Sequence, residues 1–173
     1  MRGVHGMQQL KDVYMGKDKV KLVMEYCPGK DLFDRVKYQG FIKNHSDLKK
    51  MVLSMAERIK TCHEMGISHN DIKMENFLLD CSGEPVLIDF GMSSFFSEGY
   101  RDVKLGTSYY AAPEFENGEF YKTSDVYSLG VVYGILLGYI GEHTIHHDFF
   151  KRMVSEDHTK RPLIDEVIEY VKK

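Results

Sequence analysis

The sequence predicts an α+β fold that is mostly helical and has a few short strands. Two observations favour this class. Apolar residues recur at helical spacing in three segments, and short apolar runs flank polar turns in two others, which is typical of hairpins. The chain has 173 residues, of which 43% are apolar and 28% are charged. This size and composition predict one globular domain with one core.

The first half of the chain predicts a hairpin followed by two helices. Residues 10–26 place two short runs around a polar turn, and residues 31–38 favour a short helix. A long helix follows, for which Ser46 is a suitable N-cap, and Gly66 is a suitable end.

The second half begins with another small hairpin, over residues 77–88. Residues 89–122 have no steady period and predict a long functional loop. Thr123 can cap a helix to about Leu137 that is apolar on most faces and therefore belongs in the middle of the core. A last helix is expected to start at Pro162.

Charge and composition exclude several classes of partner and location. The net charge is −3, so nucleic acid and membranes are not expected partners. The most apolar stretch, residues 129–140, is too short to span a bilayer. The N-terminus lacks the apolar run of a signal peptide. Three widely spaced cysteines predict reduced thiols and an intracellular, cytoplasmic protein: Cys27, Cys62 and Cys81.

Three short segments carry the candidate chemistry: HNDIKMEN at 69–76, DFG at 89–91 and GTSYYAAPE at 106–114. A lone DFG is an ordinary turn tripeptide. Together and in this order, the segments resemble the catalytic loop, the metal-binding tripeptide and the activation-segment end of eukaryotic serine/threonine protein kinases. The hinge of that family resembles VMEYC at 23–27, and SDVYSLG resembles its central helix. The resemblance covers nearly the whole chain.

The resemblance implies a single protein-kinase-like domain over residues 1–173. Residues 1–26 would be a remnant of the small-lobe strands and the hinge, and residues 27–173 would be the mostly helical large lobe. The chain starts at about the fourth small-lobe strand, without a preceding Gly-rich loop, lysine strand or helix with the partner Glu. Only a hairpin remnant of the small lobe is therefore expected.

The resemblance also implies the activity, which is transfer of the ATP γ-phosphate to a protein hydroxyl. The expected cofactors are ATP and Mg²⁺, and the expected partner is a protein substrate. Phosphoryl transfer requires positioning and charge neutralisation. Asp71 would accept the hydroxyl proton and Lys73 would face the transferred phosphate. Asn76 and Asp89 would bind Mg²⁺, which prefers hard oxygen donors.

Further positions match the nucleotide site of the family. Met24 stands at the gatekeeper position, and the backbone of Glu25 and Cys27 would meet adenine. Asp31 would contact the ribose, and Leu78 would form the floor beneath adenine.

Other matched residues are expected to have structural roles. Asp125 would hold the backbone of the catalytic loop. Glu114 and Arg161 would form a buried ion pair, whose loss costs about 3–5 kcal/mol. His69 is interpreted as a core histidine packed against Phe90, not as a general base.

The sequence departs from the family in the catalytic loop and after Leu137. Asn70 stands where most members have Arg, so the loop is expected to be ordered without phosphorylation. The candidate phosphorylation sites are Ser93, Ser94, Ser97 and Ser108. Thr107 falls where related kinases bond the catalytic loop. A histidine-rich segment after Leu137 is interpreted as a shortened loop in preference to a metal site: His143, His146, His147 and Asp148.

Three hypotheses remain open. All catalytic positions of the large lobe are filled, which favours a protein serine/threonine kinase, although the Gly-rich loop and lysine strand that would cover ATP are missing. Alternatively, the chain is a catalytically impaired large-lobe mimic that binds the small lobe of another kinase and regulates it. A third alternative is a fragment of a longer kinase.

Overall fold

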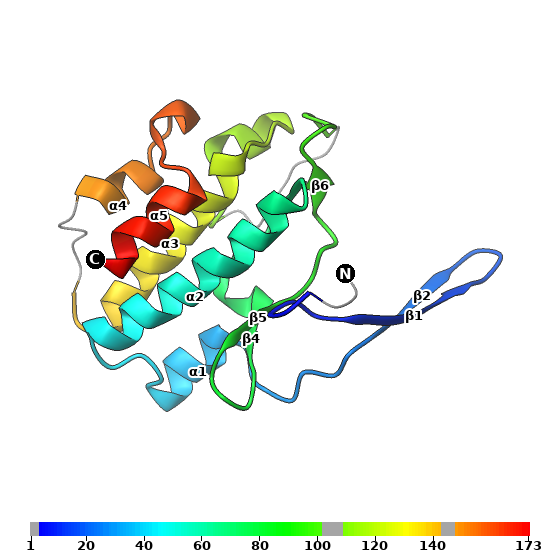
Figure 1. Ribbon diagram of the computed structural model, residues 1–173, viewed down its shortest axis with the longest axis horizontal. Coiled ribbons are helices and arrows are strands. Elements are labelled where there is room, and N and C mark those ends of the chain that lie inside the picture. The colour runs from blue at the N-terminus through cyan, green and yellow to red at the C-terminus, as the bar shows by residue number, and fades with distance from the viewer. Residues whose placement is uncertain (1–3, 102–108, 143–147) are drawn as a thin grey trace.

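The computed structural model describes residues 4–101, 109–142 and 148–173 (Figure 1). A helical body carries a two-stranded hairpin that projects from one side, so the α+β class predicted from the sequence is confirmed. The described α-helices are α1 (Leu32–Gln39), α2 (His45–Glu64), α3 (Lys122–Tyr139), α4 (Asp148–Met153) and α5 (Ile164–Lys172).

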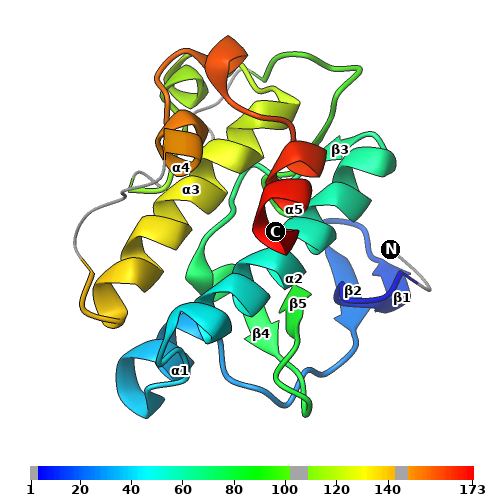
Figure 2. The ribbon, with the colours of Figure 1, turned by 60° about the vertical axis from the view of Figure 1, so that its left-hand side comes forward.

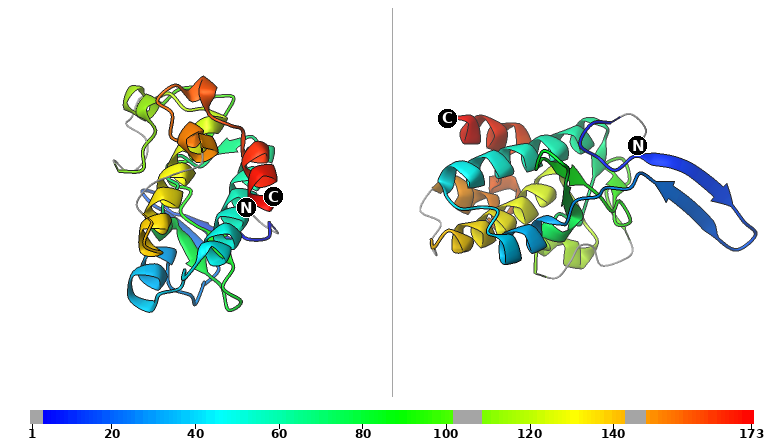
Figure 3. Two further views of the ribbon diagram at one scale, coloured as in Figure 1. Left: turned by 90° about the vertical axis from the view of Figure 1, so that its left-hand side faces the viewer. Right: turned by 90° about the horizontal axis from the view of Figure 1, so that it is seen from below.

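The predicted N-terminal hairpin is confirmed as β1 (Leu10–Met15) paired antiparallel with β2 (Val20–Met24). The Gly16 N–H closes the turn by donating to the Lys19 carbonyl at 2.8 Å. Figure 3 shows the hairpin extending away from the helices. Both of its faces are therefore largely exposed, with only the ends near Leu10 and Met24 partly covered.

The hairpin is joined to the body by residues that precede it. Leu87 donates to the Gly6 carbonyl at 2.9 Å and accepts from the Gln8 N–H at 3.0 Å. Between these two bonds, Met7 is 2% exposed and belongs to the core. The base of the hairpin is thus fixed although its tip is not covered.

The core lies between α2 and α3, with α5 packed against α2 (Figure 2). The α3 helix buries residues on most of its faces, as its composition predicted. Gly130 makes the close packing possible, because a Cβ there would lie 2.9 Å from the Met153 Cβ. Gly138, further along the helix, has open space around it.

Two predicted helix caps were wrong. The α2 helix begins after Asn44, whose side chain accepts from the Asp47 N–H at 3.0 Å, and Ser46 lies within the first turn. The α3 helix begins after Tyr121. Thr123 does not cap it, because its hydroxyl donates to the His158 carbonyl at 3.1 Å.

The smaller elements surround the candidate site. They are β3 (Ile67–Ser68), β4 (Phe77–Leu79), β5 (Pro85–Leu87) and β6 (Ser94–Phe95), and the 3₁₀ helices η1 (Met74–Asn76), η2 (Pro113–Asn117) and η3 (His158–Lys160). The strand pairs are β3 with β6 and β4 with β5, both antiparallel, and the second pair is the predicted hairpin at residues 77–88. No helix in the described part of the chain has the length and apolar character to cross a membrane.

Candidate active site

The loop that joins β3 to η1 meets the start of the Asp-Phe-Gly tripeptide. The Asn76 carbonyl accepts from the Ile88 N–H at 3.0 Å, and the His69 ring contacts the Ile88 carbonyl at 3.1 Å. Asp89 follows Ile88 directly. Two segments separated by a hairpin in the sequence are therefore held side by side.

Asp71 lies at the centre of this junction and is 7% exposed. Its Oδ2 atom accepts from the Lys73 Nζ at 2.7 Å and from the Asn76 Nδ2 at 2.9 Å. Asn76 also donates to the Asp71 carbonyl at 2.8 Å. The carboxylate orientation is thus set by one cation and one amide.

The Asn76 amide has a consequence for metal binding. Because its Nδ2 is turned toward Asp71, its Oδ1 is left without a hydrogen bond from another described residue. Asp89 is exposed, and its Oδ1 accepts from the Gly91 N–H at 3.2 Å. These hard oxygen donors fit Mg²⁺. Within the described ranges, no cluster of three or more His, Cys, Asp or Glu side chains could hold a metal ion.

Backbone strain is concentrated at the same junction. Asn70 and Asp89, with φ of 64° and 60°, are the two described non-glycine residues with positive φ. Asn and Asp tolerate this left-handed conformation better than other side chains. Strained residues tend to cluster at active sites, where the surrounding contacts hold them.

His69 is fully buried and both of its ring nitrogens are used. Its Nε2 lies 3.1 Å from the Ile88 carbonyl, and its Nδ1 accepts from the Asp71 N–H at 3.3 Å. Burial lowers the pKa of His69, so the ring is neutral. Its edge-to-face contact with Phe90, at 4.9 Å between ring centroids, matches the core histidine expected from the sequence.

Asp125, on α3, holds the backbone of the loop between β3 and η1 in place. It is 0% exposed and accepts from the His69 N–H and the Asn70 N–H, both at 2.9 Å. The His63 ring, at 2.9 Å from Oδ2, completes its surroundings. Burial alone would raise the pKa of Asp125, but the hydrogen bond and charge of His63 outweigh it and lower the pKa. The anchoring expected of Asp125 is confirmed.

The expected ion pair of Glu114 and Arg161 is present and bidentate, with N–O distances of 2.7 and 2.8 Å. The Ser124 hydroxyl also donates to Glu114. Burial opposes ionisation of Glu114, but hydrogen bonds from Arg161 and Ser124 lower its pKa overall. The Arg161 guanidinium lies 4.8 Å from the ring centroid of Tyr127.

The five candidate nucleotide residues lie along the segment that leaves the hairpin and along β4. Asp31 and Leu78 form a bridge, so the expected ribose and adenine positions are adjacent. The Asp31 carboxylate accepts from the Asp34 N–H at 2.8 Å and caps α1. The Glu25 N–H donates to the Gln9 carbonyl at 2.7 Å, and the Glu25 carbonyl accepts from the Gln8 side chain at 3.3 Å.

The other two nucleotide candidates are partly covered. Met24 ends β2, and Cys27 follows three residues later. Burial, followed by the charges of Glu25 and Asp80, raises the pKa of the Cys27 thiol. Both residues are thus brought to the junction of hairpin and body.

Sequence reasoning missed Arg101, which reaches back to the segment after the tripeptide. Its guanidinium donates to the Met92 carbonyl at 3.0 Å, and it lies 3.4 Å from the Ser94 hydroxyl. Asn70 donates to these same two groups, at 3.0 and 3.2 Å. No local pattern around a lone loop arginine could have indicated this contact. Thr107, Ser108, His143, His146 and His147 lie outside the described residues.

A pocket of about 300 Å³ lies between the hairpin and the tripeptide, where Leu10, Met24 and Phe90 line it. Leu22 also lines this pocket, and further apolar side chains of the hairpin are exposed: Val13, Tyr14, Met15, Val20 and Val23. Contiguous apolar surface of this kind often marks an interaction site.

Comparison with known proteins agrees with this geometry. Residues 5–141 match the protein kinase domain family. Calcium-dependent protein kinase 14 of Oryza sativa subsp. japonica is 41% identical over 142 residues, which cover 79% of this chain and 27% of that protein. Calcium-dependent protein kinases 27 and 21 of Arabidopsis thaliana are 38% and 37% identical, and the matches cover 79% of this chain and 30% and 26% of those proteins. The chain thus spans less than a third of the length of these relatives.

Proposed function

Because this chain belongs to the eukaryotic serine/threonine protein kinase family, we propose that it provides the phosphotransfer site of a protein serine/threonine kinase. The expected kinase-like fold with a partial small lobe is confirmed by the family match. We assign residues 1–26 to the small-lobe remnant and hinge, and residues 27–173 to the large lobe. The proposed reaction transfers the ATP γ-phosphate to a serine or threonine hydroxyl of a protein substrate inside the cell.

Each catalytic candidate has a role that its contacts support. Asp71 is oriented by Asn76 and Lys73, and would accept the proton of the substrate hydroxyl. Lys73, which forms a salt bridge with Asp71, would neutralise charge on the transferred phosphate. The Asn76 Oδ1 and the Asp89 carboxylate would hold Mg²⁺, which when bound neutralises charge on the ATP phosphates.

The nucleotide would lie against the junction of hairpin and body. Leu78 is half-buried and would present an apolar surface to adenine, and the adjacent Asp31 would accept a ribose hydroxyl. The Glu25 carbonyl accepts a hydrogen bond from the side chain of the half-buried Gln8 at 3.3 Å. Such a long contact is weak, so adenine can replace it. The peptide N–H of Cys27 is the second group assigned to adenine.

The observation that carries the proposal is the orientation of Asn76. Asn76 is 4% exposed and turns both of its amide donor contacts to Asp71, so its Oδ1 receives no hydrogen bond from another described residue and is left available as a ligand. We assign this oxygen to Mg²⁺, for which a carboxamide oxygen is a suitable hard ligand.

A phosphotransfer assay with peptides that differ only in a Ser, Thr or Tyr acceptor tests the proposal. We expect phosphate on Ser and Thr, and a fall of about 10²–10⁴-fold in rate for Asp71→Asn, because general-base catalysis is typically worth that factor. Asp165→Asn, an exposed carboxylate on α5, is the matched control. Phosphotyrosine as the main product, or an unchanged rate in Asp71→Asn, would contradict the assignment.

The exposed apolar hairpin favours a second candidate function, a large-lobe mimic that binds another kinase's small lobe. Unpaired strand edges and open apolar surface invite such pairing. Light scattering of the chain mixed with a kinase small lobe would distinguish the two. A stable one-to-one complex that Leu22→Asp abolishes supports docking, and a complex without phosphotransfer would favour the mimic over the enzyme.

A further inference from the structure

The side chain of Arg101 holds together the stretch that directly follows the Asp-Phe-Gly tripeptide. Its guanidinium donates to the Met92 carbonyl at 3.0 Å and to the Ser93 carbonyl at 3.3 Å, and it lies 3.4 Å from the Ser94 hydroxyl. A planar guanidinium has five N–H donors in a fixed fork, which suits it to neighbouring oxygen acceptors. One side chain thus contacts three consecutive residues.

Asn70 reaches the same stretch from the catalytic loop. Its Nδ2 donates to the Met92 carbonyl at 3.0 Å and to the Ser94 hydroxyl at 3.2 Å. A carbonyl oxygen has two lone pairs and can accept from both side chains. Asn70 is 1% exposed and directly precedes Asp71, the assigned proton acceptor. Through these shared acceptors, Arg101 is connected to the loop that carries Asp71.

The backbone of Arg101 is fastened to the end of η2. Its N–H donates to the Gly118 carbonyl at 2.9 Å, and the neighbouring Tyr100 forms an antiparallel bridge with Glu119. Gly118 has a φ of 75°, and a Cβ there would collide with the Arg101 carbonyl oxygen, so this approach requires glycine. Because η2 also carries Glu114 of the buried ion pair, Arg101 projects from an anchored part of the chain.

The contacts of Arg101 involve no negative charge. Within residues 4–101, 109–142 and 148–173, the guanidinium donates to carbonyl and hydroxyl oxygens and forms no ion pair. Hydrogen bonds from a charged donor are roughly twice as strong as those between neutral groups. A half-buried arginine with such acceptors can therefore order this stretch without a phosphate.

We propose that Arg101 is a positioning residue of the phosphotransfer site, which holds the stretch after the tripeptide against the catalytic loop and so fixes the arrangement of Asp71 and Asp89. It acts through hydrogen bonds to neutral acceptors that Asn70 shares. The role rests on the proposed function and assigns Arg101 no contact with substrate or nucleotide.

Phosphotransfer kinetics of Arg101→Ala test this role. Loss of a charge-assisted hydrogen bond should lower kcat about 10–100-fold, because Asp71 and Asp89 are no longer held together. KM for ATP should stay close to that of the parent chain, since the residues assigned to adenine and ribose lie on the hinge and on β4. Arg101→Lys, which keeps the charge and loses the fork, should be intermediate.

Millimolar guanidinium chloride should restore part of the lost kcat in Arg101→Ala, because the free cation offers the donors that the variant lacks. Sodium chloride at the same ionic strength should not. The urea midpoint of Arg101→Ala should stay close to that of the parent chain, since Arg101 lies outside the apolar core.

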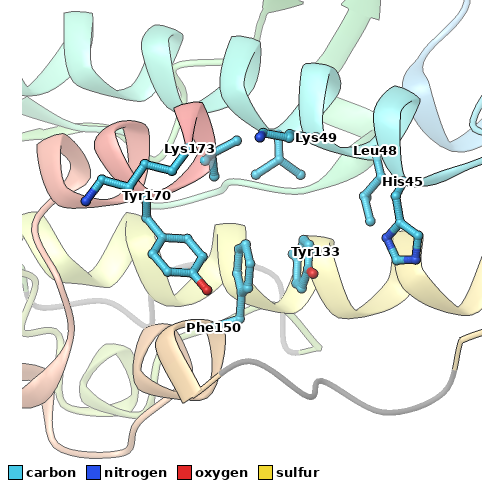
Figure 4. Close-up of a pocket in the computed structure, with 9 residues that line it drawn as sticks. His45, Leu48, Lys49, Tyr133, Phe150, Tyr170 and Lys173 are labelled. Carbon is cyan, nitrogen blue, oxygen red and sulfur yellow. The ribbon is translucent and has the colours of Figure 1, made fainter.

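Hydrogen exchange tests the same contacts without nucleotide. In Arg101→Ala, amides of residues 92–101 should exchange faster, and those of α2 should not change. Arg152→Ala is the matched control, because this exposed guanidinium also reaches a carbonyl, that of Lys160, at 3.4 Å. Its helix, α4, contributes Phe150 to the pocket of about 330 Å³ in Figure 4, whose lining shares no residue with the contacts of Arg101.

A double-mutant cycle tests the connection to Asn70. Asn70→Gly removes the amide and accommodates the φ of 64° at this position. Because both side chains use the Met92 carbonyl, the effects of Asn70→Gly and Arg101→Ala on kcat should combine less than multiplicatively. Fully multiplicative effects would overturn the shared-acceptor role.

An unchanged kcat in Arg101→Ala would also overturn the role. A kcat loss that accompanies a lower urea midpoint and that guanidinium does not restore would mark a merely structural residue. Failure of the proposed function is distinguishable, because the parent chain itself would then lack phosphotransfer. In that case faster exchange in Arg101→Ala would still support the bracing of residues 92–101, and unchanged exchange would refute it.

Discussion

Replacing Asp125 with Asn should destabilise this chain strongly, although the two side chains have nearly the same shape. The two carboxylate oxygens of Asp125 accept from the backbone N–H groups of His69 and Asn70 and from the His63 ring. An asparagine offers one acceptor oxygen, and its NH₂ group would face a donor. At least one buried donor would therefore lose its partner.

The expected magnitude follows from burial. Asp125 is 0% exposed, and removing one partner of a buried charged pair costs about 3–5 kcal/mol. Domains are typically stable by about 5–15 kcal/mol, so the variant should lose a large part of its stability. Because urea lowers the free energy of unfolding by about 1–3 kcal/mol per molar, the urea midpoint should fall by at least about 1 M.

Urea titration followed by far-ultraviolet circular dichroism measures this shift. Asp165→Asn is the matched control, because Asp165 pairs with Lys60 on the surface, where such pairs contribute about 0–1 kcal/mol. If the two variants unfold at the same urea concentration, the Asp125 contacts do not hold the catalytic loop and the reasoning is refuted.

Three further predictions concern the buried pair, the pH dependence and the activation segment. Glu114→Gln leaves the Arg161 charge buried and should cost about 3–5 kcal/mol in urea unfolding; a loss under about 1 kcal/mol would contradict the buried pair. Burial lowers the pKa of His69 in the folded chain below its usual value of 6.5. The contribution of this ring to the free energy of unfolding is therefore complete above pH 6.5 and is lost as the pH falls from 6.5 toward the folded pKa. In this range the free energy of unfolding should fall by up to about 1.4 kcal/mol per pH unit, and His69→Gln should lack this fall. If the free energy of unfolding of His69→Gln varied with pH as it does in the parent chain, this role of His69 would be excluded. Asn70→Arg would place a second cation beside Arg101, so hydrogen exchange should increase in the segment after Asp-Phe-Gly and decrease again when that segment is phosphorylated. Exchange equal to that of the parent chain would count against an activation segment ordered without phosphate.

Local apolar spacing was enough to predict the main helices and both hairpins. Helix α5, for example, buries Ile164, Val167, Ile168 and Val171, which recur at helical spacing. Helix starts were predicted less well, because Asn44 and Ser46 are both good caps and only the path of the chain decides between them. Thr123 was misassigned because its hydroxyl bonds a carbonyl 35 residues away.

The contacts of the candidate site could likewise be predicted only in part from the sequence. The contacts of Asp125 and the Glu114–Arg161 pair could be anticipated, because family motifs carry such long-range pairs within the sequence. The contact of Arg101 with Met92 could not, because it depends on how a loop without periodicity folds back.

Mg²⁺-ATP binding to the purified chain, measured by calorimetry, tests the central claim most directly. The account predicts Mg²⁺-dependent binding that Asp89→Ala abolishes and Asp165→Ala preserves, because the exposed Asp89 carboxylate is assigned to the metal and Asp165 lies on the surface of α5. A folded chain that binds no nucleotide at millimolar concentration, or binds it equally well after Asp89→Ala, would contradict the claim that these residues form a phosphotransfer site.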